Sequence, residues 1–343
     1  MKKSVKKILR IISFIAVLGI LYSILRGIGF INIYNTLKAA DIKYIIFSLL
    51  SAFALFLTWN YKWFLLVKEV KKAKFLQIFP ILMAGSFINT TTPGAKVGGE
   101  PLRAYYLSRQ YKFEKSKFFA TTILDRAINS IAFAALSVFS ILFVIVYIDI
   151  EVWIKTILEV ILVLLFLTII GGLVLRQKIK LEKRHITIIL TKIYYFYLFK
   201  IIRKKFNTYK KFENYIIKKL DNIINTFKKL IKQEKVFKKD LLLSFGMWFF
   251  NYLGTFFIFK ALGYNISFLA VIIVITLSML VGSLFALPGG MGIIETIMIS
   301  LYLSFGISSG IAATVAVIDR FIFYFYSILL GGICLIYLNI KHK

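Results

Sequence analysis

The stretch PGAKVGGE at residues 93–100 recurs as PGGMGIIE at residues 288–295. The two copies align without a gap and keep the proline, the first glycine and the glutamate in register. Each glutamate is followed, 25 or 24 residues later, by an Asp-Arg pair inside an apolar run: Asp125-Arg126 and Asp319-Arg320. This pattern predicts an internally duplicated chain that has helix breakers and charges where lipid normally excludes both.

The overall composition indicates a protein embedded in a membrane. Hydrophobic residues make up 59% of the 343 residues, and the mean hydropathy is +0.82. Several apolar runs approach the length of about 20 residues that a helix needs to cross a bilayer. The first run follows a basic start, as in a signal peptide, but no small-x-small cleavage site follows it, so we expect it to be retained. We expect six full spans, near Ile8–Leu25, Tyr44–Val67, Thr121–Tyr147, Val152–Leu175, Leu241–Leu262 and Ile311–Leu338.

The positive charge is distributed as in a membrane protein. Half of the formal net charge of +30 lies between Arg176 and Asp240, where 20 basic and 5 acidic residues give +15. Most other basic residues flank apolar runs and no base-reading module is recognisable, so nucleic acid is not an expected partner. The positive-inside rule predicts a multi-pass protein of the cell membrane with both termini in the cytoplasm. The basic clusters expected on that side are residues 2–10, 68–74, 103–117, 176–240 and 341–343.

Each motif lies in a segment, Leu76–Tyr111 or Phe268–Phe305, that begins and ends on one side of the membrane by this charge count. Each segment is therefore either a re-entrant hairpin or a pair of short spans. The first enters from the cytoplasm and the second from outside, and the Asp-Arg helices also run in opposite directions. Oppositely oriented units with broken helices at matching positions predict an inverted repeat around a transport-like site near the midplane. The alternative is a coincidence of Pro-Gly turns in surface loops.

The expected fold is an all-α polytopic membrane helix bundle with inverted repeats and two Pro-Gly-broken, re-entrant helical hairpins. We expect one integral membrane domain, 1–343, with a first half at 1–175, a basic cytoplasmic segment at 176–240 and a second half at 241–343. Within the basic segment, Tyr209–Lys235 places apolar residues on one helical stripe, which would pack on the anionic inner leaflet or on the protein's own core. The stripe consists of Ile216, Ile217, Leu220, Ile223, Ile224, Phe227, Leu230 and Ile231.

The glycines and prolines of the motifs predict breaks in the helices, because proline removes a backbone donor and glycine permits unusual dihedral angles. A helix that restarts near Glu100 would point free amides into the protein. With Lys96 and Arg103 nearby, it would form a cradle for a phosphate or another anionic head group. The second copy has Met291 and Met298 at those two positions, so we expect positive contacts in the first half only. The residues expected to shape the breaks are Pro93, Gly94, Gly98, Gly99, Pro288, Gly289, Gly290 and Gly292.

Ionisable residues inside apolar runs are the candidate ligand-binding groups, since a charge in lipid is costly unless it is paired, neutralised or hydrated. Glu100 and Glu295 either serve head-group coordination, proton coupling or gating, or cap their half-helices. Adjacent helical residues point about 100° apart, so we expect each Asp-Arg pair to find partners on other elements, for example the glutamate of a broken helix. These pairs are either structural ion pairs between helices or carry an arginine for substrate phosphate. The candidate substrate-binding residues are Lys96, Glu100, Arg103, Asp125, Arg126, Glu295, Asp319 and Arg320.

The sequence contains no motif of an enzyme active site. HExxH, the nucleophile elbow and the Walker loop are all absent. The single Cys334 excludes an intramolecular disulfide and a cysteine metal cluster, and His185 and His342 lie outside the expected spans. We therefore expect no catalytic residues, metal or cofactor. Membrane lipids are the expected partners, with the inner leaflet contacted through residues 176–240, and a homo-oligomer is left open.

Residues 93–107 (PGAKVGGEPLRAYYL) and 288–295, with the IDR at 318–320, resemble the transmembrane region of lysylphosphatidylglycerol synthases and related stand-alone membrane proteins. The likeness extends from the first expected span to the last. In full-length members this region is similar to a lipid flippase, and a separate soluble domain attaches the amino acid to the lipid. Because the sequence ends at Lys343, directly after its last expected span, we do not expect aminoacyl transfer. The resemblance implies a module that binds or translocates lipid.

The leading hypothesis is an integral membrane protein that binds a phospholipid or lipid-linked head group between two inverted halves and helps it to cross the bilayer. Two alternatives use the same residues. One is a small-solute or ion transporter built on the broken helices. The other is a membrane-embedded enzyme whose paired carboxylates perform acid-base chemistry on lipid-linked substrates.

Overall fold

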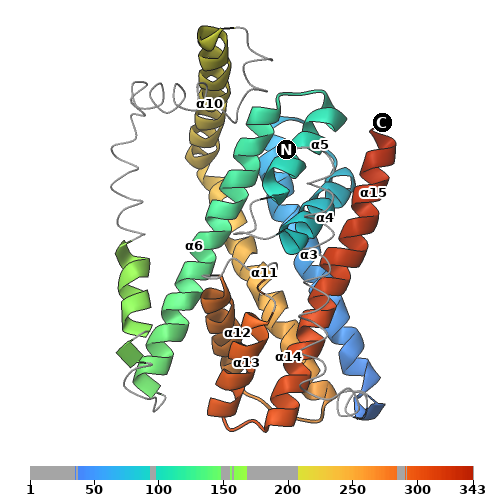
Figure 1. The fold of residues 1–343 in the computed structure, drawn as a ribbon, viewed down its shortest axis with the longest axis vertical. Helices are drawn as coiled ribbons and strands as arrows, with labels where there is room; N and C mark the ends of the chain where they lie inside the picture. The colour runs from blue at the N-terminus through green and yellow to red at the C-terminus, as the bar shows by residue number, and fades with distance from the viewer. Residues whose placement is uncertain are drawn as a thin grey trace.

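The structure, a computed structural model, describes residues 35, 38–92, 98–147, 155–156, 158–167, 208–283, 290 and 292–342. This part of the chain is mostly helical and contains no strand, which confirms the expected all-α membrane bundle. Figure 1 shows the helices arranged along one long axis. They are α3 (Ile42–Val70), α4 (Phe75–Thr91), α5 (Gly99–Tyr111), α6 (Lys115–Tyr147), α10 (Tyr209–Lys232), α11 (Glu234–Ala261), α12 (Phe268–Gly282), α13 (Ile293–Ser304) and α14 (Ser309–Tyr324), the last continued by a π-helical turn, η3 (Phe325–Leu330), and α15 (Gly331–Lys341).

Four of the described helices are long and apolar enough to cross a membrane: α3, α6, α11 and the continuous run Ser309–Lys341. Only 17–33% of the residues in their most apolar windows are buried, so most of their side chains retain exposed surface, as expected for helices that contact lipid. These helices confirm the spans expected at Tyr44–Val67, Thr121–Tyr147, Leu241–Leu262 and Ile311–Leu338.

The remaining two expected spans are described only in part. Ile8–Leu25 lies outside the described residues. Of Val152–Leu175, the structure describes residues 155–156 and an apolar helix at Leu158–Leu167. The count of six spans therefore stays a prediction.

Each motif-bearing segment folds as two short helices that pack on each other, α4 with α5 and α12 with α13. In both cases the interruption falls on the Pro-Gly motif, as the sequence predicts. Figure 1 shows the two hairpins at opposite ends of the bundle, with α4 and α5 above and α12 and α13 below. In the same view α6 descends, whereas α14 and α15 rise.

The helix packing of the first half recurs in the second. The second helix of each hairpin packs on the following span, α5 on α6 and α13 on α14. The first helix of each hairpin packs on the long helix of the other half, α4 on α15 and α12 on α6. The spans that precede the hairpins, α3 and α11, pack along each other, and each also contacts its own hairpin. Apart from the contacts of α10, each of these packed helix pairs in one half therefore has a counterpart in the other.

The amphipathic helix predicted at Tyr209–Lys235 is present as α10, which ends at Lys232. Leu230 is 1% exposed and lies in a buried cluster with Leu66, Leu124 and Ile128 of α3 and α6. In Figure 1, α10 stands along the long axis beyond the top of α6. The C-terminal part of its apolar stripe thus packs on the protein's own core, the second of the two partners considered. Contact of α10 with the inner leaflet stays a prediction.

Candidate functional site

Four charged side chains meet inside the bundle. Lys62 of α3 lies between two carboxylates, because its Nζ is 2.6 Å from Asp125 Oδ1 of α6 and 3.1 Å from Asp240 Oδ1 of α11. Arg103 of α5 donates from Nη2 to Asp125 Oδ2 at 3.0 Å. All four residues are at most 1% exposed. We call Lys62, Arg103, Asp125 and Asp240 the charge cluster.

Two tryptophans of α3 cover the charge cluster. Trp59 Nε1 donates to Asp125 Oδ2 at 3.1 Å. The guanidinium carbon of Arg103 lies 3.8 Å from the centroid of the Trp63 ring. A planar, weakly hydrated guanidinium stacks well on an indole, and the attraction is strongest where water is excluded. The tryptophans therefore orient Arg103 towards Asp125 while they shield both from solvent.

The formal charges of the charge cluster sum to zero, with two basic and two acidic side chains drawn from four different helices. Neutrality is essential here, because a buried charge without a partner is far more costly than a buried pair. Asp240 Oδ2 and Arg103 Nε still have no hydrogen-bond partner within the described part of the chain. The cluster fixes α5, the second helix of the first hairpin, against α3, α6 and α11.

Glu100 occupies the first turn of α5 and connects the break to α6. Its Oε1 accepts from Arg126 Nη1 at 3.1 Å and from Asn89 Nδ2 at 3.4 Å. Asn89 Oδ1 in turn accepts from the amide of Gly99 at 2.7 Å, so Asn89 caps α5 from the end of α4. The pairing of Arg126 with Glu100 confirms that an arginine of an Asp-Arg pair bonds to the glutamate of a broken helix.

Two glycines allow α4 and α5 to approach each other closely. A Cβ on Gly99 would lie 2.3 Å from the carbonyl oxygen of Gly85, and a Cβ on Gly85 would lie 2.7 Å from Arg103 Cγ. Both distances are shorter than real Cβ contacts. The glycines of this hairpin are thus required by the closeness of the two helices, which also brings Arg103 within reach of the charge cluster.

We expect Gly99→Ala to destabilise the protein by about 1–3 kcal/mol, because the added methyl group overlaps backbone that cannot move without separating α4 from α5. The direction of the stability change is informative, since alanine normally stabilises a helix by about 1 kcal/mol relative to glycine. Gly310→Ala is the matched control, because a Cβ at Gly310 of α14 meets nothing within 4 Å. Thermal unfolding of both variants in detergent, followed by circular dichroism, measures the difference. Equal stability of the two variants would refute the close approach.

The Asp-Arg pair of the second half corrects one expectation. Asp319 and Arg320 were expected to find ionic partners on other elements, but Arg320 donates from Nε and Nη2 to Asp319 Oδ2 at 3.0 and 2.6 Å. The other oxygen of Asp319 accepts a hydrogen bond from the hydroxyl of Thr255 in α11. Both members of the pair are buried. Asp125 and Arg126, in contrast, have different partners from each other, as expected.

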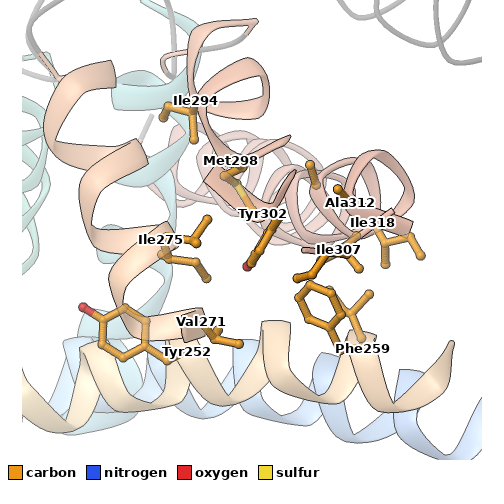
Figure 2. Close-up of a cluster of buried hydrophobic side chains, with 14 of the residues drawn as sticks. Tyr252, Phe259, Val271, Ile275, Ile294, Met298, Tyr302, Ile307, Ala312 and Ile318 are labelled. Atoms are coloured by element: carbon orange, nitrogen blue, oxygen red, sulfur yellow. The ribbon is translucent and has the colours of Figure 1, made fainter. Parts of the chain in front are cut away.

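The physical reason is a difference between α5 and α13. Three residues of α13 spaced by four, Ile294, Met298 and Tyr302, face a buried apolar cluster, which Figure 2 shows. In the motif alignment Met298 stands at the position of Arg103. Because α13 supplies no guanidinium to Asp319, the neighbouring Arg320 folds back to neutralise that buried carboxylate.

Glu295 caps the helix that it begins. Its Oε2 accepts from the amide of Gly292 at 2.7 Å, and its Oε1 accepts from the hydroxyl of Tyr324 at 3.4 Å. Gly292 has a φ of +84°, a conformation that side-chain-bearing residues rarely adopt. The capping role considered for Glu295 is thereby confirmed. The carboxylate is 3% exposed, so it is held at the break rather than in bulk solvent.

A small cavity lies between α3, α11 and α14, beside the second Asp-Arg pair. Its volume is about 30 Å³, and its polar lining comes from Ser48, Asn251 and Asp319. Phe56 and Phe250 are among its apolar lining residues. The second half of the protein thus has an open space next to a buried carboxylate.

The structure brings the predicted site residues together in two groups. Glu100, Arg103, Asp125 and Arg126 surround the break of the first hairpin, and Glu295, Asp319 and Arg320 lie beside the second. In this conformation Arg103 is bound by Asp125, whereas the Arg126 side chain is 42% exposed. Gly98, Gly99, Gly290 and Gly292 are described next to the breaks, and Gly290 has a φ of +74°. Lys96, Pro93, Gly94, Pro288 and Gly289 lie outside the described residues.

The sequence reasoning missed two members of the charge cluster. Lys62 is the single charged residue in the expected span Tyr44–Val67, and that isolation was a usable signal. Asp240 was assigned to the basic loop, because the expected span began at Leu241. The helix α11 begins earlier, at Glu234, and so places Asp240 inside the bundle. Asn89, which caps α5, gave no comparable signal.

The chain matches the sequence profile of the lysylphosphatidylglycerol synthase TM region over residues 10–331. Among similar proteins, a UPF0104 membrane protein of Pyrococcus horikoshii is 31% identical over 302 residues, which cover 86% of this chain and 87% of the relative. A UPF0104 membrane protein of Methanocaldococcus jannaschii is 28% identical over 338 residues, covering 96% and 94%. One from Methanothermobacter thermautotrophicus is 28% identical over 292 residues, covering 85% and 84%.

Proposed function

The chain belongs to the lysylphosphatidylglycerol synthase TM region family, and we propose that it binds the head group of a phospholipid or lipid-linked molecule and helps it to cross the bilayer. The observation that carries the proposal is the position of Glu100 and Glu295. Each is a buried carboxylate in the first turn of a helix that restarts after a break. Such breaks at membrane depth are tolerated where backbone lines a polar path.

The arrangement of the two halves supports this function. Most helix contacts in one half have a counterpart in the other, and the long helices of the two halves run in opposite directions (Figure 1). We infer an inverted repeat whose two hairpins are re-entrant, one from each side of the membrane. Inverted repeats place the substrate at their interface and allow alternating access by rocking of one unit against the other.

Arg126 is the group best placed to meet a lipid phosphate. It lies five residues after the start of the expected span Thr121–Tyr147, or about 8 Å along the helix axis, and so inside that span. Its side chain is 42% exposed, and that of Ile131, five residues further along α6, is 50% exposed. A phosphate that approaches from the lipid side would find a guanidinium there, which favours bidentate binding. Lys96, Arg103, Asp125, Glu295, Asp319 and Arg320 would support the polar path, with Pro93, Gly94, Pro288 and Gly289 shaping it.

The orientation follows from the positive-inside rule. Figure 1 shows α10, α5 and the C-terminal end of α15 at the same end of the bundle. These elements carry basic residues expected on the cytoplasmic side: those of 103–117, the lysines of α10 and Lys341. We place this end in the cytoplasm of the cell, with both termini on that side. The proposed partners are membrane lipids, and no catalytic step is part of the proposal.

Reconstituted vesicles that contain a fluorescent phospholipid test the proposal. We expect the protein to make inner-leaflet phosphatidylglycerol or phosphatidylethanolamine accessible to an external quencher, whereas empty vesicles protect it. Arg126→Gln should slow this exchange about tenfold, which corresponds to about 1.4 kcal/mol in the barrier. Lys238→Gln is the matched control, because Lys238 pairs with Glu234 at a surface where both side chains are at least 75% exposed.

The same preparation distinguishes the alternatives. Uptake of a solute without movement of any labelled lipid would indicate a small-solute or ion transporter. Chemical conversion of a lipid-linked substrate by the purified protein would indicate an enzyme. Absence of protein-dependent exchange for every head group tried, with the protein folded, would refute lipid translocation.

A further inference from the structure

The buried carboxylates Asp125 and Asp319 occupy matching positions but have different neighbours. Asp125 Oδ1 lies 2.6 Å from the ammonium nitrogen of Lys62 in α3. Asp319 Oδ1 accepts a hydrogen bond from the hydroxyl of Thr255 in α11. Since α3 and α11 occupy equivalent places in the helix packing, the Thr255 hydroxyl is the counterpart of the Lys62 ammonium as a partner of the carboxylate. A long cation in one half is therefore replaced by a short neutral side chain in the other.

The space that differs is the cavity beside Asp319. In the first half, Lys62 and Asp240 fill the region between α3, α11 and α6. In the second half, the region between α3, α11 and α14 holds the cavity of about 30 Å³. A single water needs roughly 10–15 Å³ measured in this way, so the cavity accommodates about two water-sized particles. This is too small for a lipid head group and suits a small ion with one water.

The formal charges of the two halves also differ, and again the second half lacks a cation. The charge cluster and the Glu100–Arg126 pair are both neutral. Among the described residues, the group around the second hairpin has two buried carboxylates, Asp319 and Glu295, and one buried cation, Arg320. One positive charge is needed to balance this group, and buried groups without such balance are costly.

We propose that the cavity beside Asp319 binds one small alkali-metal cation, with sodium as the probe. Asp319 and Ser48 line the cavity and have oxygen-bearing side chains, and hard cations prefer oxygen ligands. The remaining volume holds a water ligand of the ion. That water would also accept from Asn251 Nδ2, which is buried without a partner in the described part of the chain. The ion thus takes the place that the Lys62 ammonium occupies in the first half.

The role of the bound cation in transport rests on the proposed function. A cation bound between α3, α11 and α14 sits where the two halves meet, so its binding would favour one arrangement of the halves over another. Cation binding itself is measured without any lipid movement, so failure of this inference is distinguishable from failure of the proposed function.

Gly254 offers a variant that blocks the cavity without disturbing the fold. Gly254 lines the cavity, and a Cβ there would lie 3.7 Å from both the carbonyl oxygen and the Oγ of Ser48, which are ordinary contact distances. Gly254→Ala should therefore fold as well as the parent, since alanine favours a helix. Gly246→Ala is the matched control in the same helix, because the nearest atom to its Cβ would be Thr58 Cγ2 at 4.0 Å.

Sodium binding to the purified full-length protein tests the inference, by radioactive sodium uptake in a filter assay and by thermal unfolding in sodium chloride against choline chloride at equal ionic strength. We expect saturable binding of one ion and a rise of Tm with sodium. Gly254→Ala and Asp319→Asn should each raise the Kd for sodium at least about tenfold, whereas Gly246→Ala leaves it unchanged.

Two results would overturn the inference. One is the absence of saturable sodium binding to a folded protein, including the case in which Tm follows pH alone, which would assign the balancing charge to a proton. The other is sodium binding of unchanged affinity in folded Gly254→Ala. Should Asp319→Asn fail to fold, Gly254→Ala still decides the question.

Discussion

Lys62→Met should destabilise the protein by about 3–5 kcal/mol, the largest loss of stability expected here, because it leaves two buried carboxylates facing one buried guanidinium. Asp125 keeps its bond to Arg103, but Asp240 loses its ionic partner while it remains 0% exposed. Methionine fills a similar volume, so the change removes the charge and little packing. The measurement is unfolding in mixed detergent micelles, followed by circular dichroism.

Two further variants separate charge from packing in this experiment. Lys62→Met combined with Asp240→Asn restores neutrality in the charge cluster, and we expect it to recover part of the loss, about 1–3 kcal/mol. Lys238→Met removes an exposed partner of Glu234 on the helix that carries Asp240, and should cost less than about 1 kcal/mol. A loss for Lys62→Met no greater than that for Lys238→Met would show that the buried charges do not depend on one another.

Glu295→Gln should slow lipid exchange about tenfold while it changes the stability by less than about 1 kcal/mol. Glutamine retains an oxygen that accepts from the Gly292 amide, so the cap at the start of α13 survives. What the variant removes is the negative charge next to Arg320. If head-group movement depends on that charge at the break, exchange falls although the helix still begins at the same residue.

Glu295→Ala is the companion variant, because it removes the cap as well as the charge. We expect it to cost about 1 kcal/mol of stability in addition to the loss of exchange. Glu234→Gln is the matched control for the same chemical change at a side chain that is 77% exposed, and it should leave exchange unchanged. Normal exchange in Glu295→Gln, with reduced stability in Glu295→Ala, would mean that Glu295 serves only as a cap.

The long apolar runs gave the most secure predictions. The helices that cover Tyr44–Val67 and Thr121–Tyr147 are present in full, because about 20 apolar residues in lipid have no alternative to helix. The breaks at the two motifs were equally predictable, since proline and glycine act on the local backbone. The start of α11 was harder to predict, because the composition of Glu234–Lys239 is typical of a polar loop. In the structure these residues form the first turns of the helix that continues into the span.

The partners of the charges could not be deduced in the same way. Adjacent residues on a helix usually point apart, yet Arg320 turns back to Asp319, whereas Arg126 reaches Glu100. What decides between these outcomes is whether the facing helix offers a counter-charge, as α5 does with Arg103 and α13 does not with Met298. That depends on which side chains of distant segments lie opposite each other.

By itself, the sequence determined that this protein is a helical membrane bundle with a repeated motif, where its helices break and which carboxylates lie at the breaks. These properties follow from local chemistry: hydropathy over one span, the backbone limits of proline and glycine, and the repetition of a motif. Only the tertiary structure decided that Lys62 and Asp240 join Arg103 and Asp125, and that a cavity lies beside Asp319. Ion pairing and packing depend on distances between segments far apart in the chain, such as Lys62 and Asp240, which are separated by 178 residues, and only the folded chain sets these distances.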